Sequence, residues 1–172
     1  MTDNNSSILC YIGLGANLSE PLLQLQQAVL ALKNIKATEL VAVSSFYGSK
    51  PMGPQDQPDY VNAVAALRTE LTAEQLLDAL QHIELEQGRQ RKDERWGPRT
   101  LDLDILLFGE QCINTARLTV PHYGMKNREF VLYPLAEIQA DLQLPDGTLL
   151  QQLLTQVPAN GLTVLQPAPN IT

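Results

Sequence analysis

The fold is decided by one stretch, residues 95–109, which reads RWGPRTLDLDILLFG. Its first part is irregular, because Gly97 and Pro98 break any helix and a proline forces the residue before it out of the helical region. Its second part is a mostly apolar run that stops at Gly109, which is typical of a buried strand. The stretch therefore predicts a loop that leads directly into a strand over residues 101–108.

This strand carries two aspartates on one face. Side chains alternate along a strand, so two opposite sets are expected: Leu101, Leu103, Ile105 and Leu107, against Asp102, Asp104, Leu106 and Phe108. Two carboxylates on a half-buried face, with Cα atoms roughly 6.5 Å apart by the strand rise, repel each other unless a cation lies between them. Magnesium accepts one or two carboxylates and completes its shell with water and phosphate oxygens. The strand thus indicates a metal–phosphate site.

The loop before the strand adds positive charge and an aromatic ring. Arg95 and Arg99 carry guanidinium groups, which match phosphate oxygens. Trp96 offers a flat surface for a ring. An Asp-x-Asp pair alone is more often a solvated strand edge. The adjoining arginines and tryptophan favour a phosphoryl-transfer site instead.

The composition excludes several functional classes. A chain of 172 residues with 44% hydrophobic and 18% charged residues suits one globular domain, so we predict a single domain over residues 1–172. The net charge of −7 argues against a nucleic-acid or anionic-membrane binder, and no apolar run is long enough to span a bilayer. Yet eight of the 12 basic residues lie within residues 89–128. This concentration suits a small polyanionic ligand.

The termini and cysteines indicate a cytoplasmic protein. Residues 1–7 are polar and lack the basic and apolar parts of a secretory signal. Cys10 and Cys112 lie in apolar stretches, and we expect both to be reduced core residues, although their spacing leaves a disulfide open. Residues 1–7 and 158–172 are expected to be loosely held.

Periodicity and helix breakers predict the other elements. Strands are expected over residues 8–14, 39–47 and 60–67, and helices over residues 21–33 and 72–87. With the aspartate strand, the order is β-α-β-β-α-β, the split pattern of ferredoxin-like folds. It predicts an α+β fold in which a mainly antiparallel sheet carries both helices on one face and the aspartate strand pairs with the first strand.

Two local signals refine this expectation. Residues 72–75, which read TAEQ, form a capping box at the start of the second helix, and Gly88 is expected to end that helix. Residues 48–58 contain too much proline and glycine for regular structure. Long connections of this kind are often binding loops.

Residues 95–109 resemble the signature of the 6-hydroxymethyl-7,8-dihydropterin pyrophosphokinase family of folate biosynthesis, and the resemblance extends over residues 11–154. It implies a ferredoxin-like core elaborated into a three-layer α/β/α sandwich. It also implies the reaction, in which ATP gives its terminal pyrophosphoryl unit to the hydroxymethyl group of a reduced pterin and AMP leaves. We therefore expect a cytoplasmic, monomeric ATP-dependent pyrophosphokinase whose partners are ATP and the pterin.

The resemblance also implies roles for individual residues. The catalytic set is Arg89, Arg99, Asp102 and Asp104, of which Asp102 and Asp104 match metal-binding aspartates that hold two Mg²⁺ ions. The ATP-binding set is Gln81, Glu84, Arg89, Trp96, Arg99, Ile105, Arg117, Thr119, His122, Tyr123 and Arg128. The pterin-binding set is Ser49, Lys50, Met52, Tyr60, Asn62, Trp96, Asp102 and Phe130.

The pterin-binding set contains side chains that suit a flat, polar ring. Tyr60 and Phe130 match two stacking rings, and Asn62 offers both a donor and an acceptor to a lactam and amine edge. The chain departs from the family pattern in two places. Residues 49–53 read SKPMG where TPPLG is commoner, and Ala16 stands where a serine is common.

Two other functions remain open from the residues alone. A nucleotidyltransferase also places two aspartates on alternate strand positions, but it attacks the α-phosphorus and releases pyrophosphate. Many such enzymes carry a Gly-Ser pair on a helix before the aspartates, whereas this chain has Gly97 and Pro98 on a loop. The second alternative is a nucleotide- or pterin-binding module without catalysis. The nucleotide that is released distinguishes the three.

Overall fold

The computed structural model describes residues 7–17, 20–49, 60–89 and 101–171, which form both strands and helices. In order they are β1 (Ile8–Ala16), α1 (Pro21–Lys33), β2 (Thr38–Val43), β3 (Phe46–Ser49), β4 (Tyr60–Thr69), α2 (Ala73–Arg89), β5 (Asp102–Phe108), β6 (Ile113–Asn114), β7 (Thr119–Val120), the 3₁₀ helix η3 (Met125–Asn127), α3 (Glu129–Ile138), α4 (Leu150–Gln156) and β8 (Thr163–Gln166).

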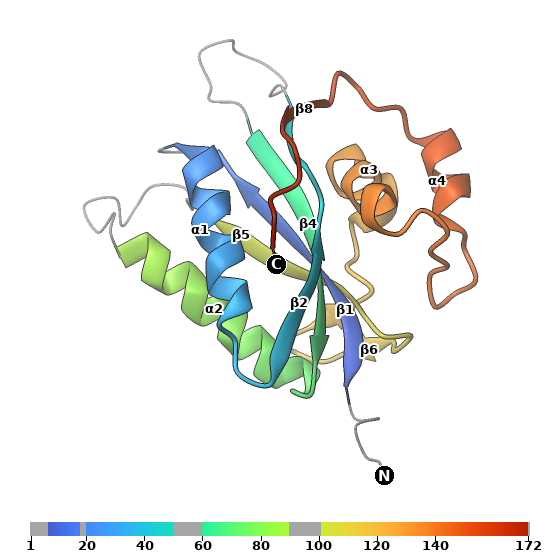
Figure 1. The fold of residues 1–172 in the computed structure, drawn as a ribbon. Helices are drawn as coiled ribbons and strands as arrows, with labels where there is room; N and C mark the ends of the chain where they lie inside the picture. Colours follow the sequence, from blue (N-terminus) through green and yellow to red (C-terminus); the bar gives the residue numbers. More distant parts are fainter. Residues whose placement is uncertain (1–6, 18–19, 50–59, 90–100, 172) are drawn as a thin grey trace.

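The main sheet is arranged around β1, which lies between β4 and β5 (Figure 1). The strand order is β5-β1-β4-β3-β8, and β2 pairs with the same edge of β4 as β3 does. All of these pairs are antiparallel. The predicted pairing of the aspartate strand with the first strand is therefore confirmed, and so is the α+β class.

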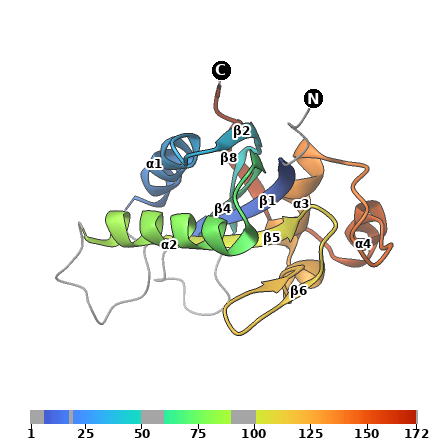
Figure 2. The ribbon, with the colours of Figure 1, turned by 90° about the horizontal axis from the view of Figure 1, so that it is seen from below.

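Helices cover both faces of the sheet (Figures 1 and 2). The α1–α2 layer buries Leu25, Leu32, Leu76 and Leu80, and the α3–α4 layer buries Leu132, Leu135 and Leu150. Burying one such side chain contributes about 1.5–3 kcal/mol, so packing against the sheet stabilises both layers. The three-layer α/β/α arrangement agrees with the prediction. Across the described ranges, no helix has the length and apolar character needed to cross a bilayer.

The side-chain alternation predicted for the aspartate strand is wrong at its far end. Ile12 on β1 lies opposite Ile105, but Tyr11 lies opposite Leu107, so Leu106 is an extra residue in a β-bulge. The bulge turns Leu107 to the α3–α4 face with Leu106, and Phe108 to the α1–α2 face. One inserted residue changes the face of every side chain after it.

The strand predicted over residues 39–47 is two strands, because the chain leaves the ladder at Ser44 and Ser45. The N–H of Ser44 donates to the carbonyl of Val64 at 2.8 Å, while the Val64 N–H donates to the Ser44 hydroxyl oxygen at 3.0 Å. A side-chain oxygen thus replaces a backbone acceptor in the ladder. The N–H of Ser45 is free to bind a side chain outside the sheet.

The C-terminal segment differs from the expectation that residues 158–172 are loosely held. Thr163–Gln166 form β8, which pairs with β3. A Cβ atom on Gly48 would lie 2.7 Å from the Leu165 side chain, so that side chain occupies the space beside Gly48. Residues 1–6, at the other end, lie outside the described residues.

The two cysteines lie in different environments. Cys10 is fully buried, and burial raises the pKa of its thiol to about 12. Cys112 is exposed, so the prediction that it is a core residue is wrong. It precedes the short β6–β7 hairpin, where two-residue strands bury little surface.

The predicted capping box begins α2. The Gln75 N–H donates to the Thr72 hydroxyl oxygen at 3.1 Å, and the Thr72 N–H donates to the Gln75 side-chain oxygen at 2.9 Å. These two bonds satisfy N–H groups that a helix start leaves unpaired. The helix then continues through Gly88 to Arg89, two residues beyond the predicted end, so the prediction that Gly88 ends it is wrong.

Replacing Thr72 with alanine removes the cap and should lower the free energy of unfolding by about 1 kcal/mol. Urea denaturation followed by circular dichroism measures this loss. The matched variant Gln75→Glu keeps an acceptor at the third position of the box and should unfold at the wild-type midpoint. Equal midpoints for Thr72→Ala and wild type would show that the box does not stabilise α2.

Candidate active site

The strand register places the aspartates opposite glycines. Asp102 pairs with Gly15 and Asp104 with Gly13, and Gly15 pairs on its other side with Asn62. Directly paired residues share a face, so these side chains share the α3 side of the sheet. A Cβ atom on Gly15 would lie 2.9 Å from the Asn62 amide nitrogen, which leaves no room for a side chain there. Sequence reasoning did not assign these glycines, although glycine inside a strand often marks a close approach.

A cavity of about 380 Å³ opens over this end of the sheet. Its lining combines strand residues from β1, β4 and β5 with residues from the segment that leads into α3. Seven predicted site residues line it: Tyr60, Asn62, Asp102, Asp104, His122, Arg128 and Phe130. The structure therefore brings together residues that lie up to 70 positions apart in the chain.

Asn62 presents an unpaired polar atom in this cavity. The residue is 8% exposed, and its Oδ1 has no hydrogen-bond partner among the described residues. Buried polar atoms in folded proteins are nearly always hydrogen-bonded. A ligand with an amine or amide N–H can supply the missing donor.

The bulge in β5 holds His122 beside Asp104. The backbone N–H of His122 donates to the carbonyl of Leu106, the bulged residue, at 3.0 Å. Its Nδ1 accepts from the Gly124 N–H at 3.1 Å, so the neutral ring carries its proton on Nε2. That atom lies 3.9 Å from the Asp104 carboxylate. Burial lowers the pKa of His122, the charge of Asp104 opposes this shift and the charge of Arg128 reinforces it.

Aromatic rings and a guanidinium group stack at the cavity. The rings of His122 and Tyr123 are stacked with centroids 4.8 Å apart, and Arg128 Cζ lies 5.8 Å from the centroids of both Tyr123 and Phe130. A Cβ atom on Gly124 would lie 2.8 Å from the Arg128 guanidinium, so this glycine leaves space for the charged group. Tyr123 itself is 82% exposed and leaves a ring surface open to a ligand.

Besides Tyr123, five predicted ATP-binding residues with described side chains do not line this cavity: Gln81, Glu84, Ile105, Arg117 and Thr119. Arg117 donates to Asp78 of α2 at 2.7 Å and to Gln81 at 3.3 Å. Ile105 is buried in the α1–α2 layer, and Thr119 lies in the β6–β7 hairpin. These residues form a second group, on the α2 side of β5.

Glu84 connects this second group to the aspartate strand. Its carboxylate accepts a 2.7 Å hydrogen bond from the N–H of Leu103, the residue between the two aspartates. The two groups of predicted residues therefore meet at β5, one on each side.

The side chains of the remaining predicted site residues lie outside the described part of the structure. Lys50, Met52, Trp96 and Arg99 lie outside the described residues, as does the loop that contains Gly97. For Ser49 and Arg89 only the backbone is described; they are the last residues of β3 and α2.

The donor set fits magnesium. In the described part of the chain, no group of three or more His, Cys, Asp and Glu side chains is placed to hold a metal. Magnesium needs no such group, because one or two carboxylates suffice when water and phosphate complete the shell. The Asp104 side chain is 53% exposed, which leaves its oxygens accessible to a hydrated ion.

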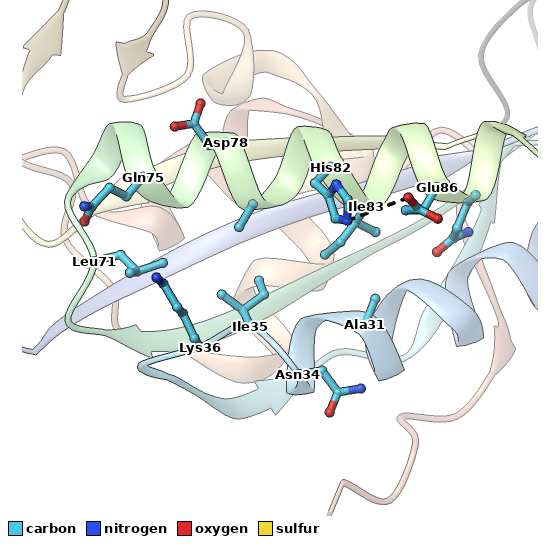
Figure 3. A pocket seen from close by; sticks show the side chains of 12 residues that line it. Ala31, Asn34, Ile35, Lys36, Leu71, Gln75, Asp78, His82, Ile83 and Glu86 are labelled. Carbon is cyan, nitrogen blue, oxygen red and sulfur yellow. Dashed lines mark ion pairs between the residues drawn. The ribbon is translucent and has the colours of Figure 1, made fainter.

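A larger hollow of about 610 Å³ lies elsewhere, between α1 and α2 (Figure 3). Its lining includes Ala31, Ile35 and Ile83, together with the ion pair between His82 and Glu86. None of the predicted site residues lines it. The predicted site residues that share a cavity are therefore those that line the smaller one, over Asp102 and Asp104.

Solved structures with a similar fold support this architecture. An HPPK-DHPS chain in complex with substrates matches with a TM-score of 0.68 at 12% sequence identity, over 87% of this chain and 43% of that chain. A wild-type Plasmodium falciparum HPPK-DHPS with pteroate matches with a TM-score of 0.64 at 11% identity, over 91% and 43%. The chain thus spans less than half of these structures, and at this identity they bear on the fold alone.

Curated relatives are much more similar in sequence. The 2-amino-4-hydroxy-6-hydroxymethyldihydropteridine pyrophosphokinase of Pseudomonas aeruginosa is 59% identical over 92% of this chain and 97% of its own length. The enzyme of the same name from Haemophilus influenzae is 55% identical over 93% and 99%.

The model of the 7,8-dihydro-6-hydroxymethylpterin-pyrophosphokinase (HPPK) family matches residues 11–140. This agrees with the resemblance of residues 95–109 and with the residues gathered over the aspartate strand. The chain belongs to the 7,8-dihydro-6-hydroxymethylpterin-pyrophosphokinase family and, with ATP as co-substrate, transfers a pyrophosphoryl group to 6-hydroxymethyldihydropterin in folate biosynthesis.

Proposed function

We propose that the cavity over Asp102 and Asp104 is where this transfer takes place, with the pterin and the reacting phosphates side by side. The observation that carries the proposal is the convergence of seven predicted site residues on one cavity. The cavity has an apolar and aromatic side near Phe130 and Val131 and an acidic side at β5. A flat ring and a metal-bound phosphate need these two environments.

The pterin occupies the side near Asn62. Its amine and lactam edge donates to the unpaired Oδ1 of Asn62 and accepts from the amide nitrogen. Phe130 and Tyr60 stack on its ring. Ser49, Lys50, Met52 and Trp96 belong to the same proposed set of pterin contacts. Asp102 lies nearest the hydroxymethyl group.

The phosphates occupy the side near β5. Asp102 and Asp104 would hold two Mg²⁺ ions, which neutralise charge on the transferred group and on the leaving oxygen when bound. Arg128 donates to phosphate oxygens, and neutral His122 donates from Nε2. Arg89, at the end of α2, and Arg99 would contribute further positive charge. The hydroxymethyl oxygen attacks the β-phosphorus, and AMP departs.

The nucleotide extends to the α2 side of β5. Gln81, Glu84, Ile105, Arg117 and Thr119 are the residues proposed to bind it there, and Tyr123 adds an exposed ring. Glu84 supports this arrangement, because its bond to the Leu103 N–H ties α2 to the aspartate strand.

A product assay tests the reaction. The chain is mixed with ATP, magnesium and 6-hydroxymethyl-7,8-dihydropterin, and the nucleotides are resolved by chromatography. We expect AMP in a one-to-one ratio with a pterin diphosphate, and no turnover when EDTA removes the metal. Pyrophosphate without AMP would indicate nucleotidyl transfer, and ATP binding without any turnover would indicate a binding module.

Asp104→Asn should fold normally and lower kcat by at least about a hundredfold, because a charged metal ligand is lost while the side-chain shape is kept. Glu110→Gln is the matched control, since it removes a carboxylate just after β5 and outside the cavity. Steady-state kinetics and thermal melts of both variants measure the effect. Wild-type turnover by Asp104→Asn would contradict the assignment of this carboxylate.

The pKa of His122 should lie below its usual 6.5, because burial outweighs the attraction of Asp104. The ring is then neutral at pH 7 and donates from Nε2 without adding charge. An NMR titration measures this pKa, and His82→Gln assigns the signals because the chain has two histidines. A pKa above 6.5 would mean that the charge of Asp104 dominates and that a cationic ring faces the phosphates.

We also place the enzyme in the cytoplasm as a monomer. The free thiols of Cys10 and Cys112 are compatible with a reducing compartment. Size-exclusion chromatography with light scattering checks the oligomeric state.

A further inference from the structure

We infer that Glu137 is a positioning residue that joins α3 to β3 and so sets the spacing between the two walls of the pterin slot. This inference rests on the proposed function of the cavity. Neither Glu137 nor its partners line the cavity, and none belongs to the predicted site.

Glu137 accepts three hydrogen bonds, two from Ser45 in the break between β2 and β3 and one from Tyr47 of β3. The Ser45 N–H donates to Oε1 at 2.9 Å, the Ser45 hydroxyl donates to Oε2 at 2.8 Å, and the Tyr47 hydroxyl donates to Oε1 at 2.6 Å. Hydrogen bonds to a charged acceptor are roughly twice as strong as neutral ones. A single side chain of α3 thus holds three polar groups of the β2–β3 segment in place.

We call the Glu137 carboxylate, together with its partners Ser45 and Tyr47, the clamp. Tyr47 connects this clamp to the wall of the pterin slot that contains Asn62. It pairs with Asn62 on β4, and Asn62 pairs with Gly15, which pairs with Asp102. Tyr47, Asn62, Gly15 and Asp102 therefore form one row across four strands, on the side that faces α3. Holding Tyr47 in place therefore holds its direct neighbour in this row, Asn62, whose Oδ1 is unpaired.

Phe130 connects the clamp to the other wall. It lies seven residues before Glu137 in α3, which is two helical turns and places both side chains on nearly the same face. A movement of α3 away from β3 would carry Phe130 away from Asn62. The clamp and the ring-stacking residue thus belong to the same helix, in which Pro134 lies between them.

The chemistry of the three donors explains why a carboxylate lies here. The Ser45 N–H has left the ladder at the β2–β3 break, and a buried N–H without an acceptor is costly. Burial, then the hydrogen bond and the charge of Glu137, raise the pKa of the Tyr47 hydroxyl, so it remains a donor at neutral pH. Glutamine can keep all three contacts, because its oxygen accepts from Ser45 N–H and Tyr47 while its amide donates to the Ser45 hydroxyl.

The test compares Tyr47→Phe, Glu137→Ala and Glu137→Gln with wild type. The readouts are kcat, the KM values for pterin and ATP, and pterin affinity by fluorescence titration with a non-hydrolysable ATP analogue. Tyr47→Phe should weaken pterin binding about threefold to tenfold, and Glu137→Ala about tenfold or more. The KM for ATP should stay within about twofold, and Glu137→Gln should remain within about threefold of wild type for pterin.

Tyr133→Phe is the matched control for a loss of stability alone. Its hydroxyl donates to the Val157 carbonyl at 2.8 Å and joins the same helix, α3, to the segment after α4, away from the slot. It should lower the melting temperature and leave pterin affinity unchanged. If Glu137→Ala does not fold, Tyr47→Phe and Glu137→Gln carry the comparison.

The inference is overturned if the Tyr47 and Glu137 variants melt earlier but bind pterin as wild type does, or if the KM for ATP rises by the same factor as the KM for pterin. A wild-type protein that does not bind pterin would instead refute the proposed function, and the inference with it. Wild-type pterin binding separates these two failures.

Discussion

The structure depends above all on the register of β5 against β1, and on the single extra residue in that pairing. Before the bulge, Asp102 and Asp104 lie opposite Gly15 and Gly13, so two carboxylates face an open space. At the bulge, the Leu106 carbonyl accepts a hydrogen bond from the N–H of His122. This bond holds the imidazole beside Asp104. After the bulge, Leu107 packs into the core on the α3–α4 face, and Phe108 packs into the core on the α1–α2 face. One irregular residue thus separates the polar and apolar halves of the strand and anchors the next part of the site.

The α3 side of the sheet accordingly has an apolar end and a polar end. One end packs Val64, Leu106 and Leu107 against α3 and α4. At the other end Asn62 and the aspartates line the cavity. A rigid sheet can hold such groups in a geometry suited to a ligand before the ligand binds. In the proposed complex, the ligand rather than the protein offsets the cost of the unpaired buried oxygen of Asn62.

Much of the fold could be predicted because its signals are local. Helical periodicity, the capping box at Thr72 and the breakers between segments were enough for the β-α-β-β-α-β order and for the pairing of the aspartate strand. The bulge at Leu106, the break at Ser44 and the strand β8 could not be predicted, because each depends on a partner strand far away in sequence. β8 is also only four residues long, and its two apolar residues, Val164 and Leu165, are adjacent and do not alternate with polar ones, so it carries no strand periodicity. For the site, the motif indicated which residues matter, but only the tertiary structure separates the cavity group from the α2 group that contains Arg117.

The central claim is that one cavity holds both the pterin and the reacting phosphates. A crystal structure with magnesium, 6-hydroxymethyl-7,8-dihydropterin and an ATP analogue that resists cleavage between its α- and β-phosphates tests it directly. The account predicts a pterin ring between Asn62 and Phe130, with its hydroxymethyl group toward the β-phosphate and metal bound at Asp102 and Asp104. A pterin bound elsewhere, for example in the hollow between α1 and α2, or phosphates far from these aspartates, would contradict it.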